Sequence, residues 1–486
     1  MKKIKTLLII LAVFGMIFSL SVNVAAPVKA ETKQAYKVKI GALGPLDITP
    51  GKDMKAGFDL AVKEINAAGG FVVGSTTCEF ESYVESNSGS DGLPDPQKAA
   101  TALTKLQDQE DVVAIVGGFR TEVVASIMGD MDRPFLGVGS TVPITSPYFW
   151  RVGPVNGSSL TRGYLDVYSL GLSAQLGVRN VTIVREDAEW TLPLAAAIKG
   201  FLHYDPYGIG FPKMNFTSDI AIPQAASQDA VTTALTPLQG EFEGYNVNAL
   251  CTIFSAPVGR YVTVAWHSLN LPQYLAGINV ESQASTYFDE LEGACYGEIE
   301  AQTDAPDFNQ TIKTGPFRAA YYAEYAETPT YTAIASYDSV YLIKDAIERA
   351  DSIVPEHIQN ALLTTDYQGT VYKIKFTSED NQTTAPTPTT VHDLWTSSTI
   401  GVDGRPYYQG YYCQWQKGGV KKTIFLGQFR DITENVIQAP INHSDHGWTS
   451  AVPVTTPGLE LPIVAFSIVF IAAIALSFKK RKRKVP

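Results

Sequence analysis

The chain has little of what enzymes and metal proteins need. Its 486 residues include only six histidines and four cysteines. It contains no H-E-x-x-H, no G-x-S-x-G, no glycine-rich phosphate loop and no C-x-x-C, so the signatures of zinc proteases, serine hydrolases, nucleotide sites and dithiol redox sites are absent. An H-S-D-H stretch at 443–446 lies in a polar linker and is read as chance. We therefore expect no enzyme, no cofactor and no metal.

Positive charge is scarce in the middle of the chain. Ten of the 38 basic residues lie in segments 1–30 and 479–484, so the 28 that remain face 49 acidic residues and the body carries a net charge of −21. Such a charge repels nucleic acid and anionic lipid and keeps a domain soluble. It excludes nucleic acid as a partner of the body but names no ligand.

The N-terminal segment carries the pattern of a secretory signal peptide. Lys2, Lys3 and Lys5 precede an apolar run, and the small-residue site V-K-A stands before Glu31. A basic region, an apolar core and a small-residue cleavage site are the three parts of such a signal. We predict a signal peptide over residues 1–30; a permanent N-terminal anchor is the alternative.

The C-terminal segment predicts a membrane anchor. Residues 461–478 are uncharged and are followed directly by KKRKRK. Eighteen helical residues extend about 27 Å, close to the thickness of a hydrocarbon core, and basic residues stay on the cytoplasmic side. We expect a stalk over 431–458, a transmembrane helix over 459–478 and a basic cytoplasmic tail over 479–486. A buried core helix and a processed sorting signal are the alternatives.

Two further features fit an extracellular body at the cell surface. Six N-x-[ST] sequons indicate a glycoprotein; they begin at Asn156, Asn180, Asn215, Asn309, Asn381 and Asn442. Outside the cell, cysteines can pair. Cys78, Cys251, Cys295 and Cys413 allow three connectivities. Because Cys251 and Cys295 both lie in predicted strands of the same half, that pair is favoured.

The body alternates apolar strands with amphipathic helices in two series. The first begins with VKIGAL and a helix that carries Met54, Phe58 and Ile65 on one face and ends at Gly69 and Gly70. The second series begins with NVTIVRE and contains ALCTIF and QYLAGI. Near-continuous apolar strands separated by such helices predict parallel sheets covered on both faces. The expected fold class is therefore α/β with two doubly wound parallel-sheet lobes joined by a hinge.

Three strand-end loops predict a ligand site. They read GPLDITPG, GGFRTE and VGSTVPIT, and ligands of open parallel sheets bind beyond the carboxyl ends of the strands. Glycines let backbone N–H groups approach an anion, and Thr121 adds a hydroxyl donor. Each loop alone is explained by a helix cap or a turn, but three in register favour a site. Arg120 is either a direct anion clamp or a solvated residue at the rim of the cleft. Trp190 either packs in the core or stacks on the ligand, and its acidic approach REDAEW favours the cleft.

The order of these stretches resembles a known family. KIGALGPLD, AIVGGFRTEVVASIM, PFLGVGST, YFWRVGP, VTIVRED, ASYDSVYLIKDAIERA and CQWQKGG are similar to the type I periplasmic binding proteins, specifically the branched-chain amino-acid (Leu/Ile/Val)-binding receptors of ABC transporters. The resemblance covers about residues 37–430. It implies two lobes joined by three crossovers, lobe 1 over 36–153 and 305–368 and lobe 2 over 154–304 and 369–430.

The resemblance also implies roles for particular residues. Thr121 takes the ligand carboxylate, Trp190 covers the ligand from the second lobe, and Tyr331 lines the cleft. Ser255 stands where a larger polar side chain is common, which is a departure. Glu281 is the candidate partner of a ligand ammonium. The full predicted set is Phe119, Arg120, Thr121, Gly139, Ser140, Thr141, Trp190, Ser255, Glu281 and Tyr331.

The function expected from these observations is solute capture at the cell surface. The chain would be a monomeric, membrane-anchored receptor that closes on a small polar solute, an amino acid or a related amide or carboxylate, and delivers it to an ABC permease. A ligand-sensing ectodomain without a transport role is the alternative, and the short basic tail favours the transport receptor.

Overall fold

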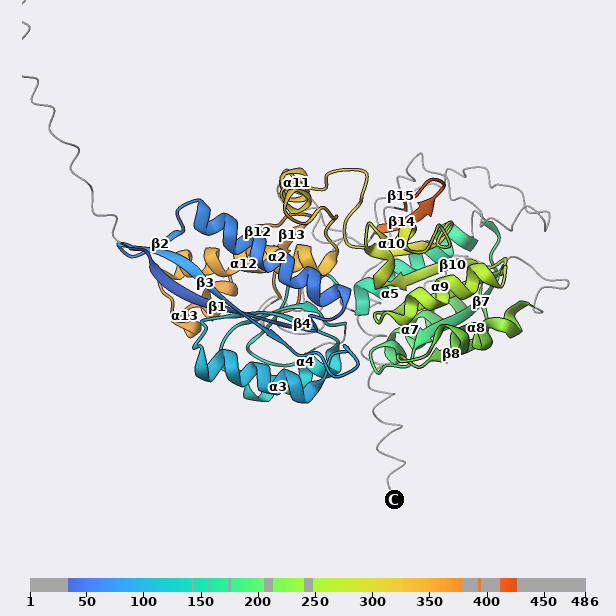
Figure 1. Ribbon diagram of the computed structural model, residues 1–486, viewed down its shortest axis with the longest axis horizontal. Coiled ribbons are helices and arrows are strands. Elements are labelled where there is room, and N and C mark those ends of the chain that lie inside the picture. The colour runs from blue at the N-terminus through green and yellow to red at the C-terminus, as the bar shows by residue number, and fades with distance from the viewer. Residues whose placement is uncertain are drawn as a thin grey trace, which may run out of the picture. The chain divides into compact units, whose positions relative to one another are not determined.

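The computed structural model describes residues 34–141, 144–155, 157–173, 176–204, 213–239, 248–377, 392–394 and 411–425. Two main sheets organise this part of the chain (Figure 1). The first sheet has the strand order β2-β3-β1-β4-β5-β6, and the second has the order β15-β14-β11-β10-β9-β7-β8. A small antiparallel pair, β12 (Asp366–Gln368) and β13 (Lys373–Lys375), forms a third sheet.

The first sheet is parallel at its centre, where β1, β4, β5 and β6 run in one direction. Its strands are β1 (Tyr36–Gly44), β2 (Phe71–Val73), β3 (Thr76–Ser86), β4 (Ile115–Phe119), β5 (Phe135–Gly139) and β6 (Phe149–Arg151). Helices α2 (Thr49–Ala67) and α12 (Tyr331–Ala350) cover one face, and α3 (Pro96–Thr104) and α4 (Thr121–Ile127) cover the other. Helices α11 (Thr314–Tyr325) and α13 (Pro355–Leu362) also pack in the core shared by α2 and α12.

The second sheet has a parallel centre and an antiparallel edge, β14–β15. Its strands are β7 (Asn180–Glu186), β8 (Asn215–Ile222), β9 (Asn248–Phe254), β10 (Tyr274–Asn279), β11 (Ile299–Gln302), β14 (Tyr411–Gln416) and β15 (Val420–Phe425). Helices α5 (Gly157–Leu165) and α7 (Thr191–Tyr204) pack on one face, and α8 (Gln228–Leu235) and α9 (Val258–Ser268) pack on the other. A short helix α10 (Tyr287–Glu290) precedes β11. The predicted α/β class with parallel sheets covered on both faces is confirmed.

Helix α2 shows how sequence sets an element. Its buried face carries Met54, Phe58 and Ile65 at helical spacing, as predicted, and packs into the core of the first sheet. The helix ends where Gly70 donates its N–H to the Ile65 carbonyl at 2.9 Å. Gly69 and Gly70 have φ angles of 95° and 76°, a left-handed conformation that favours glycine. A Cβ at Gly70 would also lie 1.9 Å from a backbone oxygen of β3.

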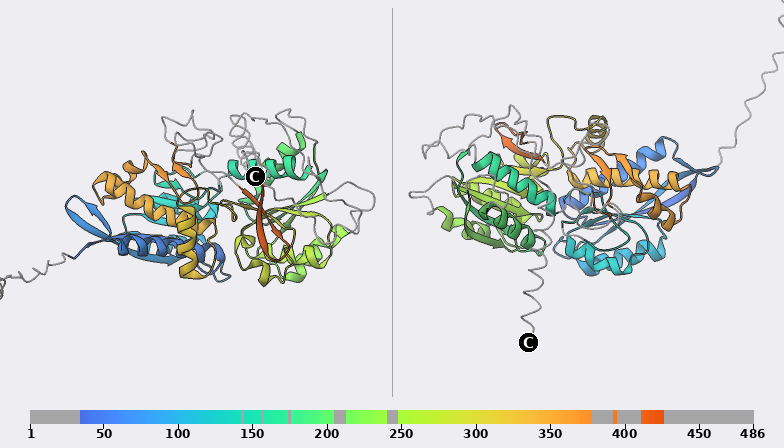
Figure 2. Two further views of the ribbon diagram at one scale, coloured as in Figure 1. Left: turned by 90° about the horizontal axis from the view of Figure 1, so that it is seen from above. Right: turned by 180° about the vertical axis from the view of Figure 1, so that it is seen from behind.

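The chain leaves the first sheet after β6, builds β7 to β11 of the second sheet, and returns to the first core with α11 and α12. Figure 2 shows this returning segment, in orange, beside the blue N-terminal segment in both views. The sequence analysis predicted that the chain passes back to the second lobe at residue 369, and this boundary is too early. Tyr372, Ile374 and Phe376 pack in the core of the first sheet, because the GTVYKIKF strand pairs with β12 as a hairpin instead of joining the second sheet.

The predicted pairing of Cys251 with Cys295 is wrong: both thiols are free and buried, as are those of Cys78 and Cys413. Cys251 lies in the middle of β9, in register with a residue of β10. Cys295 precedes β11 and packs against Trp415 in a separate cluster. Strand β10 lies between β9 and β11. The backbones of β9 and β11 are therefore separated by about two strand spacings, roughly 10 Å, which exceeds the Cα–Cα distance that a disulfide can bridge.

The predicted terminal segments lie outside the described residues. These are the signal peptide at 1–30, the stalk at 431–458, the transmembrane helix at 459–478 and the tail at 479–486. Within the part of the chain that the structure describes, no helix combines the length and the apolar character that a membrane span requires.

Candidate functional site

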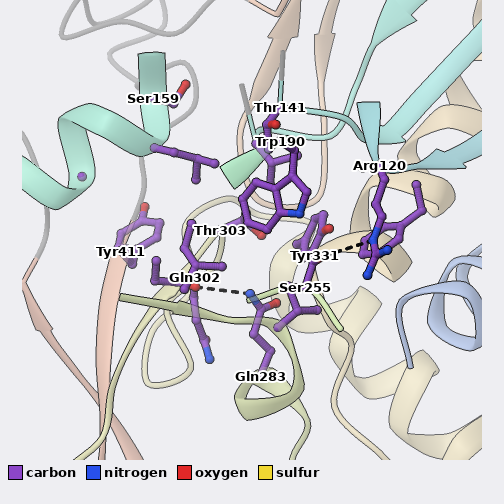
Figure 3. Close-up of a pocket in the computed structure, with 18 of the residues that line it drawn as sticks. Arg120, Thr141, Ser159, Trp190, Ser255, Gln283, Gln302, Thr303, Tyr331 and Tyr411 are labelled. Carbon is purple, nitrogen blue, oxygen red and sulfur yellow. Dashed lines mark hydrogen bonds between the residues drawn. The ribbon is translucent and has the colours of Figure 1, made fainter. Parts of the chain in front are cut away.

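A pocket lies where strand-end residues of the two sheets meet (Figure 3). The strands β4, β5, β10 and β11, together with helices α5 and α12, bring side chains to it. Its lining consists of Phe119, Arg120, Gly139, Thr141, Val155, Ser159, Leu160, Gly163, Trp190, Ser255, Ile278, Val280, Gln283, Ala301, Gln302, Thr303, Tyr331, Tyr411 and Tyr412. The cavity volume is about 60 Å³, which admits a small molecule only.

The first sheet contributes through the loops after β4 and β5. Phe119 and Gly139 pair in register at the ends of these strands. A Cβ on Gly139 would lie 2.7 Å from the Phe119 ring, so a glycine is needed for the ring to occupy its place. Arg120 N donates to the Gly139 carbonyl at 2.8 Å and ties the two loops together. Both predicted residues, Phe119 and Gly139, line the pocket.

Thr121 holds these two loops instead of facing the pocket. Its hydroxyl accepts from Thr141 N at 3.1 Å and lies 3.3 Å from Ser140 Oγ and 3.4 Å from Thr141 Oγ1. It is the first residue of α4, whose N-cap is Arg120. Thr141 lines the pocket, whereas Thr121 and Ser140 do not. The three predicted hydroxyls are thus brought together, but of the three residues only Thr141 lines the cavity.

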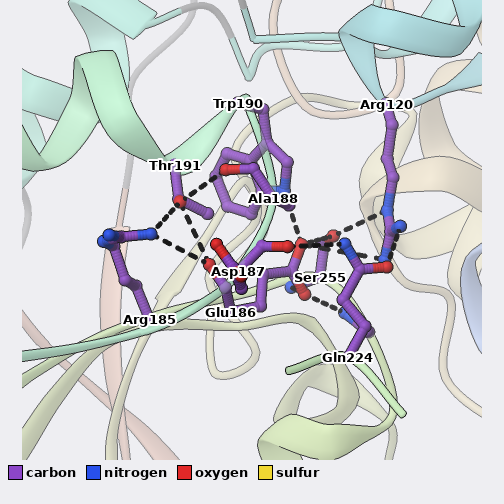
Figure 4. Close-up of polar contacts among 10 residues, drawn as sticks. Arg120, Arg185, Glu186, Asp187, Ala188, Trp190, Thr191, Gln224 and Ser255 are labelled. Carbon is purple, nitrogen blue, oxygen red and sulfur yellow. Dashed lines mark hydrogen bonds and ion pairs between the residues drawn. The ribbon is translucent and has the colours of Figure 1, made fainter. Parts of the chain in front are cut away.

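Arg120 is buried, with 6 % of its surface exposed, which excludes the solvated-rim reading. Its backbone φ is 65°, which is uncommon for a residue other than glycine. Its Nε donates to Ser255 Oγ at 3.3 Å and its Nη1 donates to Gln224 Oε1 at 2.5 Å, so it bridges to the second sheet (Figure 4). Its Nη2 is buried without a hydrogen-bond partner. A residue in a strained conformation with an unused donor is a candidate for ligand binding.

The second sheet contributes through a buried carboxylate that the sequence reasoning missed. Glu186, the last residue of β7, is fully buried. Its Oε1 accepts from Ser255 Oγ at 2.6 Å and from Trp190 Nε1 at 2.5 Å, and its Oε2 accepts from Ser255 N at 2.9 Å and Ala256 N at 2.7 Å (Figure 4). Glu186 therefore fixes the Trp190 ring and the turn that enters α9.

Trp190 and Ser255 line the pocket where they were predicted. Trp190 is 4 % exposed and packs in the core that lies under α5 and α7, and it lines the pocket as well. Tyr331, the first residue of α12, lines the pocket too, and burial raises the pKa of its hydroxyl. The strand-end position of Glu186 was visible in VTIVRED, but nothing local told it apart from the exposed acids that follow.

Glu281 is not brought to the pocket. It lies in the short helix after β10, outside the lining, and its Oε2 accepts from Thr49 Oγ1 at 3.3 Å. Its Oε1 is buried without a partner, and burial raises the pKa of the carboxyl.

The sequence reasoning also missed lining residues from β11 and β14, among them Gln302, Thr303, Tyr411 and Tyr412. The Thr303 hydroxyl is buried, with the residue 5 % exposed, and has no hydrogen-bond partner. The CQWQKGG stretch signalled β14, but the tyrosines before it carried no site pattern. Among the described residues, no group of three or more His, Cys, Asp or Glu side chains could hold a metal ion.

Part of the chain is similar to a known protein family. Residues 37–237 match the family model described as periplasmic binding protein. No curated protein matches the chain. This match agrees with the predicted resemblance to periplasmic binding proteins over that part of the chain.

Solved structures share this fold at low identity. The LivJ substrate-binding protein of Streptococcus pneumoniae in complex with isoleucine is 17% identical, covers 80% of this chain and 99% of its own, and gives a TM-score of 0.60. LivK from Thermotoga maritima is 17% identical over 81% and 99%, with a TM-score of 0.62. A solute-binding protein from R. palustris in complex with 4-hydroxybenzoate is 18% identical over 82% and 98%, with a TM-score of 0.61.

Proposed function

We propose that this chain is a solute-binding receptor that captures a small polar molecule between its two sheets and delivers it to an ABC permease. The observation that carries the proposal is that both sheets contribute to one and the same pocket, with aromatic rings and buried polar groups around it. A few well-placed polar groups in a mostly apolar hollow are typical of small-molecule sites.

The proposed mechanism is a hinged clamp. Arg120 and Thr141 come from the first sheet, and Trp190 and Ser255 come from the second. A solute that contacts both groups gains interactions only when they are close together, so it shifts the population toward the closed form. The proposed ligand-binding residues are the seven predicted residues that line the pocket: Phe119, Arg120, Gly139, Thr141, Trp190, Ser255 and Tyr331.

Two of the structural neighbours are complexes with isoleucine and with 4-hydroxybenzoate, and both ligands are carboxylates, which supports a small carboxylate-bearing ligand here. An amino acid or a related carboxylate is therefore the proposed solute class. We further propose that the body is extracellular and glycosylated, with Asn215 and Asn309 as exposed acceptors, and that the C-terminal apolar segment anchors it in the membrane. The proposed lobes follow the two cores, with residues up to 377 assigned to the first.

A thermal-shift screen of the full chain against amino acids, amides and small organic acids tests the proposal. A ligand at 100 times its Kd adds about 2.7 kcal/mol of stability. The hit is then titrated by calorimetry into Trp190→Ala, for which we expect at least a tenfold loss of affinity.

Trp266→Ala is the matched control. Trp266 is also buried at 3 % exposure, but it packs on the opposite face of the second sheet. Each truncation costs about 3–5 kcal/mol of stability, so both variants are compared under conditions where they are folded. Equal affinity losses in the two variants, or no hit in the screen, would remove the pocket from solute binding.

A further inference from the structure

The charges around the pocket bear on whether the solute carries an ammonium group. Of the described residues that line it, Arg120 alone is charged. An α-amino acid carries an ammonium that loses its water on binding, and such a group needs an acceptor in the site. If the chain binds its solute in this pocket, as the proposed function requires, these groups determine which class of solute it takes.

Glu186 is the carboxylate nearest to the Arg120 guanidinium in the polar network of Figure 4, and it has no lone-pair site left to accept another hydrogen bond. A carboxylate offers about four lone-pair sites. Glu186 already accepts four hydrogen bonds, from Trp190 Nε1, Ser255 Oγ, Ser255 N and Ala256 N. An incoming ammonium could bond to it only by displacing one of these donors. The network therefore places a carboxylate beside the pocket and at the same time closes it to a cation.

Arg120 has the opposite property. Two of its three nitrogens are engaged, Nε with Ser255 and Nη1 with Gln224, while Nη2 is buried without a hydrogen-bond partner. Glu186 Oε1 lies 3.7 Å from Nη2, which offsets part of the charge but does not satisfy the donor. A buried guanidinium with a free donor is completed by an anion, and a carboxylate matches its geometry.

A second unsatisfied group lies on the second-sheet side of the pocket. Thr303 follows β11, is 5 % exposed, lines the pocket, and its hydroxyl has no partner. Figure 3 shows Thr303 beside the Trp190 ring, among the aromatic side chains that surround the pocket. A buried hydroxyl left without a partner costs free energy, so a polar substituent on the solute would be favoured there.

We propose that the solute is an organic monocarboxylate without an α-ammonium, with a flat or branched apolar body and a second hydrogen-bonding group. Arg120 Nη2 binds the carboxylate, the rings of Trp190 and Tyr331 cover the apolar body, and Thr303 binds the distal polar group. Glu281 plays no part, since its carboxyl faces Thr49 outside the lining.

Matched pairs of probes test the ligand class by calorimetry on the full chain. 3-Phenylpropanoate and L-phenylalanine differ only in the α-ammonium, as do 4-methylpentanoate and L-leucine. We expect each acid to bind at least tenfold more tightly than its amino-acid partner. Benzoate and benzamide differ in the anionic group, and we expect benzoate to bind more tightly.

Three variants assign the groups. Arg120→Gln is expected to lower benzoate affinity at least tenfold and benzamide affinity by much less, while Arg120→Lys retains part of the benzoate affinity. Thr303→Val is expected to lower the affinity for 4-hydroxybenzoate at least threefold and not that for benzoate. Glu281→Gln is the control and is expected to change neither. Unfolding midpoints establish that each variant is folded before binding is compared.

The outcomes separate the two proposals. Tighter binding of the amino acids, above all if Glu281→Gln abolishes it, overturns the ligand class and leaves the solute-binding proposal standing. A screen hit without a carboxylate does the same. If neither probe set binds and the screen also finds no ligand, the proposed function itself falls.

Discussion

The two sides of the pocket are built in different ways. The loops after β4 and β5 are joined by hydrogen bonds between uncharged groups, from Arg120 N to the Gly139 carbonyl at 2.8 Å and around Thr121 Oγ1, which lies 3.1–3.4 Å from its partners in 140–141. The loops after β7 and β9 are organised by one buried anion, Glu186, with four donors at 2.5–2.9 Å. The charge-assisted bonds are the stronger ones. We infer that the second-sheet side is the rigid half of the site and the first-sheet side the adaptable half.

Removing the anion is the most severe way to break this contrast. Glu186→Ala leaves two backbone donors, a hydroxyl and an indole N–H buried without an acceptor. Since breaking a buried charged cluster costs about 3–5 kcal/mol, we expect the free energy of unfolding to fall by about 3 kcal/mol or more, measured by urea denaturation. Glu186→Gln keeps an acceptor and should cost less.

Asp187→Ala is the matched control, because Asp187 is the next residue and its side chain is exposed. Exposed substitutions of this kind change stability by less than about 0.5 kcal/mol. If Glu186→Ala is no more destabilising than Asp187→Ala, the second-sheet side is not organised by this carboxylate.

Protonation gives a second, smaller contrast between the two sheets. Burial raises the pKa of the Glu298 carboxyl, behind the second-sheet side, to about 7, and that of Asp338, in the first core, to about 6. A carboxyl that binds its proton more tightly when folded stabilises the protein most at low pH. Its contribution falls as the pH rises from the unfolded pKa to the folded one, by at most about 1.4 kcal/mol per pH unit.

Glu298→Gln should therefore flatten the fall in stability that we expect between about pH 4.5 and pH 7, and Asp338→Asn should flatten it only up to about pH 6. Denaturation midpoints measured across this range give both slopes. A wild-type protein whose stability rises with pH through this window would show that these carboxyls are not held protonated in the folded state.

The two sides of the pocket also differ in how far the sequence predicts their site residues. Phe119, Gly139 and Thr141 follow apolar strands directly, so strand periodicity and the strand-end rule locate them. The role of Glu186 comes from Ser255 and its neighbour on another strand, a contact that no local pattern encodes.

The same reason explains the errors in the predicted contacts. Rejecting the Cys251–Cys295 pair required knowing that β10 lies between β9 and β11, and sheet order is set by packing of the whole chain. Thr303 was missed because no strand-end loop was predicted after this part of the chain, although its hydroxyl is one of the two unsatisfied groups on which the proposed ligand class rests.

The smallest expected effect tests the adaptable side. Thr121→Val removes the acceptor of Thr141 N and the contact with Ser140, while Thr121→Ser keeps the hydroxyl. A neutral hydrogen bond contributes about 1 kcal/mol, so we expect Thr121→Val to lower the free energy of unfolding by about that amount and solute affinity about threefold, because Thr141 loses its support at the pocket. Thr121→Ser should restore most of both. A tenfold or greater loss of affinity in Thr121→Val, with unchanged stability, would instead mean that this hydroxyl reaches the solute itself when the clamp closes, and that the first-sheet side is more than a support.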